Sequence, residues 1–138
     1  MKRRLIILLQ LVFVLSPLGY AQVLVIANPA LKAAALSRSE LRDIFLGIAS
    51  TLPDGTPVAP VLLKEGTVHR YFLSRFLGRS DTAFRANWRS LLFSGQAVLP
   101  RAFDSETALV EYVARTRGAI GYIGPNAPHE RVKVIAVR

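Results

Sequence analysis

The residues that could bind a ligand lie between Lys64 and Arg70, in the run KEGTVHR. Gly66 and Thr67 stand where a loop meets the expected start of a helix. The first backbone N–H groups of a helix have no intrahelical acceptor, and the helix dipole is positive there, so such a start attracts anions. This run is therefore a candidate oxyanion site. Its members are Lys64, Gly66, Thr67, Val68, His69 and Arg70.

Each residue type in this run could contribute differently to binding an anion. Gly66 lets the chain approach an anion closely, Thr67 offers a hydroxyl, and Lys64 or Arg70 supplies positive charge. Glu65 would repel an anion unless its side chain points away. The rival interpretation is that Thr67 is an ordinary helix N-cap, worth about 1 kcal/mol.

The two histidines do not indicate a metal site or a catalytic site. His69 could pair with a phosphate oxygen when protonated, or lie half-packed on the helix flank above Leu73. His129 lies in a loop with no second ligand in view, and the chain has no cysteine. We expect no metal and no cofactor. No serine or threonine stands with a histidine base and an orienting acid, so we expect no catalytic residue and no enzyme.

The first 21 residues have the layout of a secretory signal peptide. Lys2-Arg3-Arg4 precedes the apolar run Leu5–Leu15, and Gly19 and Ala21 are small residues at the −3 and −1 positions. We expect cleavage after Ala21, which leaves residues 22–138 as one soluble exported or periplasmic domain without stable membrane insertion. The alternative is an uncleaved anchor, but the apolar run is shorter than the roughly 20 residues that span a bilayer.

The charge of the chain is compatible with several anionic partners. Removal of Lys2, Arg3 and Arg4 lowers the formal charge from +9 to +6. Such a domain could meet a small anion, an anionic lipid or an acidic protein. No run of like charges indicates nucleic acid. Four arginines could form a docking surface or simply be solvated, namely Arg75, Arg79, Arg85 and Arg89.

Apolar periodicity and turn residues predict the elements that position the site. Expected strands are 22–27, 58–63, 119–123 and 132–137, and expected helices are 37–47, 68–77, 80–95 and 105–117. Ser37 and Glu40 form a capping box, followed by an apolar stripe of Leu41, Ile44, Phe45 and Ile48. The third helix should bury Phe84, Trp88, Leu91 and Leu92. Strands separated by helices predict an α/β domain with a mostly parallel sheet of about four strands flanked by helices.

Two segments resemble the substrate-binding proteins of phosphate ABC transporters, which belong to the type 2 periplasmic binding protein superfamily. The first runs from Leu41-x-x-Ile44-Phe45-Leu46-Gly47 through Pro53-Asp54-Gly55 and Pro60-Val61 to Gly66-Thr67. The second is Arg115-Thr116-Arg117-Gly118-Ala119-Ile120-Gly121-Tyr122-Ile123. The resemblance covers nearly all of Val23–Val137. It implies a periplasmic-binding-protein-like domain that binds phosphate and works with an ABC permease or another envelope protein.

The chain departs from that family in three respects. Full-length members are about twice as long and hold the ligand between two lobes, whereas this chain carries one lobe. The early phosphate-contacting loop has no counterpart here, and the later Gly-Ser-Gly-Thr loop is reduced to Gly66-Thr67. The alternative function is therefore a periplasmic protein–protein interaction module that has the same fold and binds no ligand.

Overall fold

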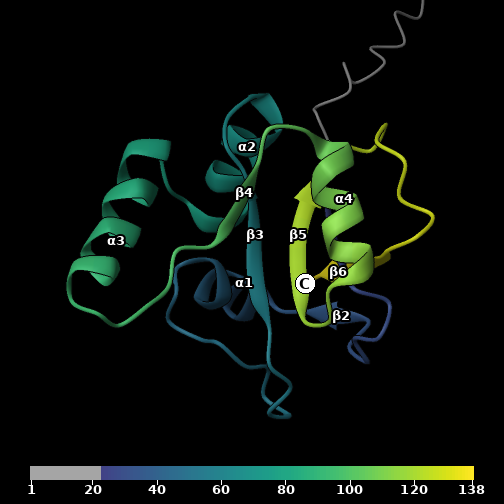
Figure 1. Cartoon of the computed structure of the whole chain (residues 1–138), viewed down its shortest axis with the longest axis horizontal. Helices are drawn as coiled ribbons and strands as arrows, with labels where there is room; N and C mark the ends of the chain where they lie inside the picture. Colours follow the sequence, from purple (N-terminus) through teal and green to yellow (C-terminus); the bar gives the residue numbers. More distant parts are fainter. Residues whose placement is uncertain (1–22) are drawn as a thin grey trace, which may run out of the picture.

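The computed structural model describes residues 23–138, and the expected signal peptide 1–21 lies outside the described residues (Figure 1). One six-stranded sheet organises the chain, with helices on both of its faces. The elements in chain order are β1 (Leu24–Ala27), β2 (Ala35–Leu36), α1 (Arg38–Phe45), β3 (Ala59–Leu63), α2 (Thr67–Phe72), the π-helix η1 (Leu73–Leu77), α3 (Asp81–Phe93), β4 (Arg101–Phe103), α4 (Glu106–Arg115), β5 (Ala119–Ile123) and β6 (Lys133–Val137).

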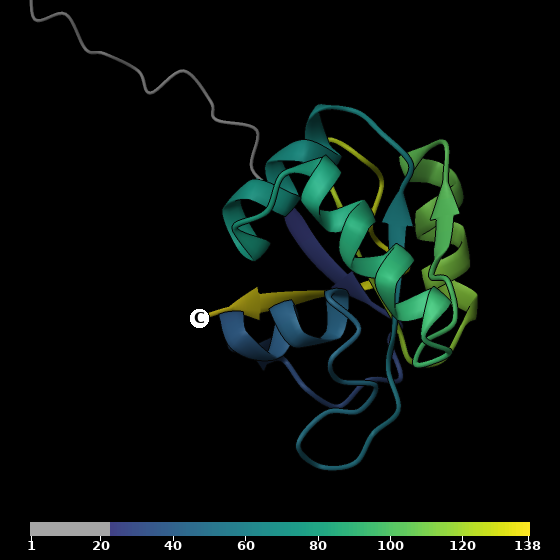
Figure 2. The same cartoon turned by 90° about the vertical axis from the view of Figure 1, so that its left-hand side faces the viewer.

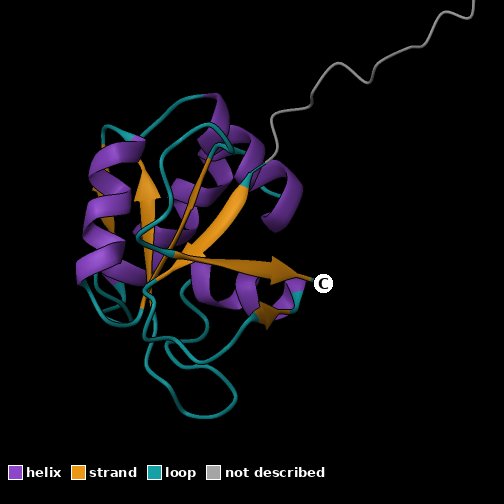
Figure 3. Ribbon diagram, turned by 90° about the vertical axis from the view of Figure 1, so that its right-hand side faces the viewer, coloured by secondary structure: helices purple, strands orange, loops and turns teal. Residues whose placement is uncertain are grey.

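The sheet confirms the α/β single-lobe prediction and adds strands to it. Its order is β2-β6-β1-β5-β3-β4. The pairs β2–β6, β3–β4 and β3–β5 are parallel, whereas β1 is antiparallel to both of its neighbours, β5 and β6. The additional strands β2 and β4 contain two and three residues, too few to produce a recognisable alternation. Figure 3 shows β6 beside the short β2, where the chain ends.

The buried strand β5 explains how helices cover both faces of the sheet. Successive side chains of a strand point to opposite faces. Gly121 faces α4, since a Cβ placed there would lie 2.9 Å from a methyl group of Leu109. Tyr122 faces the other side, where its ring stacks on Phe72 with the centroids 3.9 Å apart and lies 5.9 Å from Phe45. Figure 2 shows α3 as the outermost helix on that second side.

The helices follow the predicted pattern at their starts more closely than at their ends. The Ser37–Glu40 capping box is confirmed. Leu41, Ile44 and Phe45 are buried, but Ile48 is 70% exposed. The prediction for Ile48 is wrong because α1 ends at Phe45, and Gly47 then turns the chain with a positive φ of 74°. Ile48 is therefore no longer on the apolar face of a helix.

Two further helices differ from expectation near their ends. The predicted helix 68–77 begins one residue earlier, and its second half is π-helical from Leu73 to Leu77. In α3 the expected burial of Phe84 and Trp88 is confirmed, but Leu92 is 38% exposed. No helix in the described part of the chain combines the length and the apolar character that crossing a bilayer requires.

Candidate oxyanion site at the start of α2

The start of α2 differs from the starts of the other helices in having no side-chain cap. Ser37, Ser80 and Ser105 each accept a backbone N–H at the starts of α1, α3 and α4. At α2 the N-cap is Gly66, and no side chain accepts its first amides. Thr67 is the first helical residue, so the rival interpretation of Thr67 as the N-cap is wrong. Within residues 23–138 no acceptor contacts the N–H groups of Thr67, Val68 and His69.

Gly66 has a backbone conformation that favours glycine. Its φ of 109° and ψ of 174° lie outside the region that L side chains readily adopt. A Cβ at this position would meet no atom within 4 Å. The space beside the Gly66 Cα is therefore open, and the requirement for glycine is conformational rather than steric.

The two predicted cations have different surroundings. Arg70 is exposed, and its Nη2 lies 3.5 Å from the Thr67 hydroxyl oxygen. Among the described residues Arg70 has no carboxylate partner. Lys64 instead lies 3.3 Å from a carboxylate oxygen of Asp104. Arg70 is thus the cation better placed to assist an anion at the amides.

His69 lies in the core, and its ring does not face the predicted site. Its exposure is only 3%. Nδ1 lies 2.5 Å from the Tyr122 hydroxyl, and Nε2 lies 3.1 Å from Asp81 Oδ1. The expectation of a half-packed or phosphate-pairing imidazole is corrected, because both ring nitrogens already have partners. His69 retains only its backbone N–H for an anion.

The hydrogen bonds around Tyr122 determine which nitrogen of His69 carries the proton. The Leu63 N–H donates to the Tyr122 hydroxyl at 3.0 Å. Burial raises the pKa of Tyr122 well above its ordinary value, so the hydroxyl keeps its proton and donates it to Nδ1 of His69. An imidazole that accepts this proton at Nδ1 carries its own proton on Nε2 and donates it to Asp81 Oδ1.

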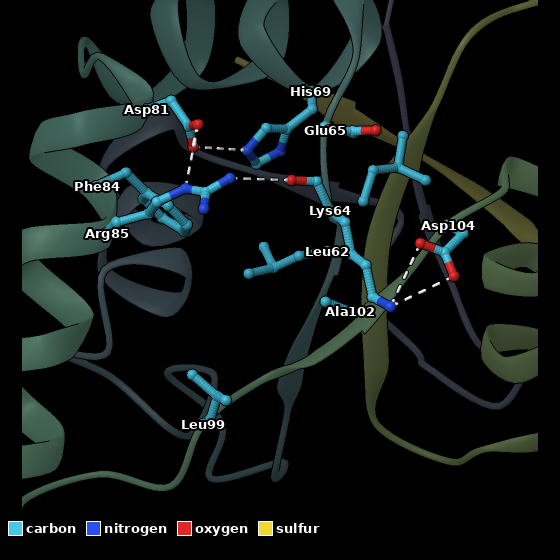
Figure 4. A pocket seen from close by; sticks show the side chains of 11 residues that line it. Leu62, Lys64, Glu65, His69, Asp81, Phe84, Arg85, Leu99, Ala102 and Asp104 are labelled. Atoms are coloured by element: carbon cyan, nitrogen blue, oxygen red, sulfur yellow. Dashed lines mark hydrogen bonds and ion pairs between the residues drawn. The ribbon is translucent and has the colours of Figure 1, made fainter.

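The same chain of hydrogen bonds continues through α3 and returns to the loop (Figure 4). Arg85 Nε donates to Asp81 Oδ2 at 3.1 Å, and Arg85 Nη2 donates to the Lys64 carbonyl at 3.3 Å. Burial acts to raise the pKa of Asp81, but hydrogen bonds from Arg85 and His69 outweigh it and hold the pKa below its ordinary value. The chain of bonds thus begins at Leu63 and ends at Lys64, so it anchors the loop before α2.

A cavity of about 470 Å³ adjoins this chain of hydrogen bonds (Figure 4). Its polar lining contains the acids Glu65, Asp81 and Asp104 against the cations Lys64 and Arg85. The acids outnumber the cations, so the cavity does not favour an anion. Of the two places, the open start of α2 suits an oxyanion better.

The contacts of Tyr122 and Asp81 with His69 were not predicted from the sequence. Thr67, Val68 and Arg70 do surround one helix start, as expected. In the sequence, Tyr122 lies within the expected strand 119–123 and Asp81 near the start of the expected helix 80–95. Their contacts with His69 span 53 and 12 residues. No local pattern reports contacts of that range.

Comparisons with known proteins show a likeness of fold. No protein-family model and no curated protein matches the chain. An ABC-type phosphate transport receptor from Vibrio cholerae is similar in structure, with a TM-score of 0.64 and 18% identity over 83% of this chain and 45% of the receptor. A putative phosphate ABC transporter substrate-binding protein with bound phosphate from Clostridium perfringens has a TM-score of 0.64 and 17% identity. The match covers 83% of this chain and 44% of that protein. PstS from Borrelia burgdorferi has a TM-score of 0.54 and 15% identity, and the match covers 84% of this chain and 47% of PstS.

These comparisons support the conclusion that the fold of this chain resembles one lobe of a periplasmic-binding-protein-like fold. The chain spans less than half the length of each of these proteins.

Proposed function

We propose that this domain binds a small oxyanion, with phosphate as the leading candidate, at the loop 64–66 and the first turn of α2. The observation that carries the proposal is the uncapped start of α2, with three N–H groups free of protein acceptors among the described residues. Two structural neighbours, a phosphate transport receptor and a putative phosphate ABC transporter substrate-binding protein with bound phosphate, support the choice of anion.

Binding at this position would need no chemical step. The amides of Thr67, Val68 and His69 would donate to the oxygens of the anion, together with the Thr67 hydroxyl. A hydrogen bond to a charged group contributes about 1.5–3 kcal/mol. Arg70 would add positive charge next to Thr67. The domain would therefore be a binding protein rather than an enzyme.

The single lobe would leave one side of the anion open. The structural neighbours are more than twice as long as the part that this chain matches. Enclosure of the anion would need a second copy of the chain or another protein, such as an ABC permease or another envelope protein. Export by the predicted signal peptide would place the domain where such partners occur.

The proposal is tested by titrating the purified protein with phosphate, followed by calorimetry and thermal unfolding. Ligand at 100 times its dissociation constant should add roughly 2.7 kcal/mol to the free energy of unfolding. Thr67→Ala, which removes one donor, and Gly66→Val, which disturbs the backbone before the amides, should each reduce this gain. Thr82→Ala is a matched control, because Thr82 is an exposed threonine in the first turn of the serine-capped helix α3.

The second candidate function is an envelope interaction module that binds no ligand. Exposed apolar side chains at the end of α3 and in the chain that follows favour it, since Phe93 is 86% and Val98 88% exposed. An absence of response to millimolar phosphate would support this alternative and contradict the anion site.

A further inference from the structure

A second, apolar groove lies between α3 and the chain that leads into β4. It encloses about 300 Å³ and shares no residue with the loop and first turn of α2. Figure 1 shows α3 on one side and the chain returning from its end to the edge strand β4. The apolar lining residues are Leu62, Phe84, Trp88, Leu92, Leu99 and Pro100.

The rim of this groove leaves large apolar side chains in water. Leu92 is 38% exposed and Leu99 is 63% exposed, and both line the groove. Their chain neighbours Phe93 and Val98 are 86% and 88% exposed. Exposed apolar side chains that gather at one groove, as Leu92 and Leu99 do, mark a binding site more often than isolated exposed residues do.

The charges at the groove are positive. Arg85 and Arg89 line it from α3, four residues apart and so on one face of the helix. Arg85 is paired with Asp81, whereas Arg89 has no carboxylate partner among the described residues. The segment 82–103 contains no aspartate or glutamate. An apolar groove with an arginine free for pairing complements a ligand with an apolar body and one negative charge.

We propose that this groove binds a small anionic amphiphile of the alkyl carboxylate class. The carboxylate would pair with Arg89, and the alkyl chain would cover the apolar lining. The volume falls at the lower end of the range for small-molecule pockets, roughly 300–1,000 Å³. The groove contains no residue of the oxyanion site at α2, although its lining residue Arg85 also donates to the Lys64 carbonyl in the loop before α2.

Trp88 allows a local test in the full chain, because it is the only tryptophan of the protein and it lines the groove. The probes are decanoate and decyltrimethylammonium, which have the same tail length and opposite charges, each kept below micelle formation. Decanoate should change the Trp88 emission saturably and bind at least about tenfold more tightly than the cation, as expected for one charge-assisted hydrogen bond.

Variants separate the contribution of charge from that of the tail. Arg89→Gln should lower the affinity for decanoate by about tenfold and remove the difference in affinity between the two probes. Leu99→Ser should lower the affinity for both probes, because it removes apolar contact with the tail. Arg115→Gln is the matched control, since Arg115 is an exposed arginine of α4, on the other face of the sheet.

Four results would overturn the proposal. The first is equal affinity for the two probes, and the second is the absence of a saturable change in Trp88 emission. The third is an equal effect of Arg115→Gln and Arg89→Gln. The fourth is a dimer, seen by sedimentation without any probe, that Leu99→Ser dissociates, because a second copy would then occupy the groove.

Discussion

The hydroxyl of Tyr122 on β5 lies 2.5 Å from Nδ1 of His69 on α2, and both groups are buried. The same hydroxyl accepts the N–H of Leu63, the last residue of β3. One oxygen atom therefore holds both ends of the loop that precedes α2. The position of the predicted oxyanion site depends on this contact between two strands and a helix.

Removal of the Tyr122 hydroxyl should destabilise the domain although the ring remains. Tyr122→Phe leaves the Leu63 N–H and His69 Nδ1 without partners in the core. A buried polar group that loses its partner costs about 1–3 kcal/mol. Urea denaturation should show a loss of this size. Tyr71→Phe is the control, because no hydrogen bond involves that hydroxyl among the described residues; an equal loss in both variants would contradict the role of Tyr122.

Acid should weaken the connection between α2 and α3 through Asp81. The folded pKa of Asp81 lies below its ordinary value of 3.8. The folded state therefore prefers the carboxylate, and the stability from this group is fully present above about pH 4 and lost as the pH falls through the folded pKa. Thermal unfolding between pH 2 and 6, roughly the range in which carboxylates titrate, should be less pH-dependent in Asp81→Asn.

Asp104→Asn provides the comparison for that acid dependence. The Asp104 side chain is 84% exposed in its pair with Lys64, and exposed ion pairs contribute little to stability. If Asp104→Asn flattened the pH curve as much as Asp81→Asn, the assignment to Asp81 would be wrong.

The close packing of α4 on β5 should make Gly121 intolerant of a methyl group. An alanine Cβ would lie 2.9 Å from Leu109 Cδ2 and 2.9 Å from Val61 Cγ2. Overpacking of this kind costs about 1–3 kcal/mol. Combining Gly121→Ala with Leu109→Ala should cost less than the sum of the two single variants, because the new methyl group fills part of the cavity. Additive losses in urea denaturation would contradict the contact.

The starts of α1 and α2 should respond differently to loss of a hydroxyl. Ser37→Ala removes a capping box and should lower the free energy of unfolding by about 1 kcal/mol. Thr67→Ala should change it by less than about 0.5 kcal/mol in phosphate-free buffer, since the Thr67 hydroxyl caps no amide. A larger loss for Thr67→Ala would show that the hydroxyl has a structural role.

Local patterns predicted the elements of this fold better than their arrangement. The runs at β1, β3, β5 and β6 are short and largely apolar, and the start of α2 was predicted to within one residue. The direction of β1 was not predictable, because a strand buried on both faces has the same pattern in either direction. The strands β2 and β4 are recognised only by their pairing with β6 and β3, because they have too few residues for an alternating apolar pattern.

The candidate site divides in the same way. The loop and the amides follow from a glycine before a helix, which is a local signal. The partners of the His69 ring depend on β5 and α3, which lie 53 and 12 residues away in sequence. His69 was therefore expected near the surface, whereas tertiary packing places it in the core.

The most direct test of the central claim is the response of individual backbone amides to phosphate, measured by ¹H–¹⁵N NMR at constant ionic strength with chloride as the reference. We expect saturable downfield shifts of the Thr67, Val68 and His69 amide protons, with one dissociation constant for all three. The amides at the serine-capped start of α3 should not move. Shifts spread over many exposed arginines, or no shift at millimolar phosphate, would contradict an oxyanion site at the start of α2.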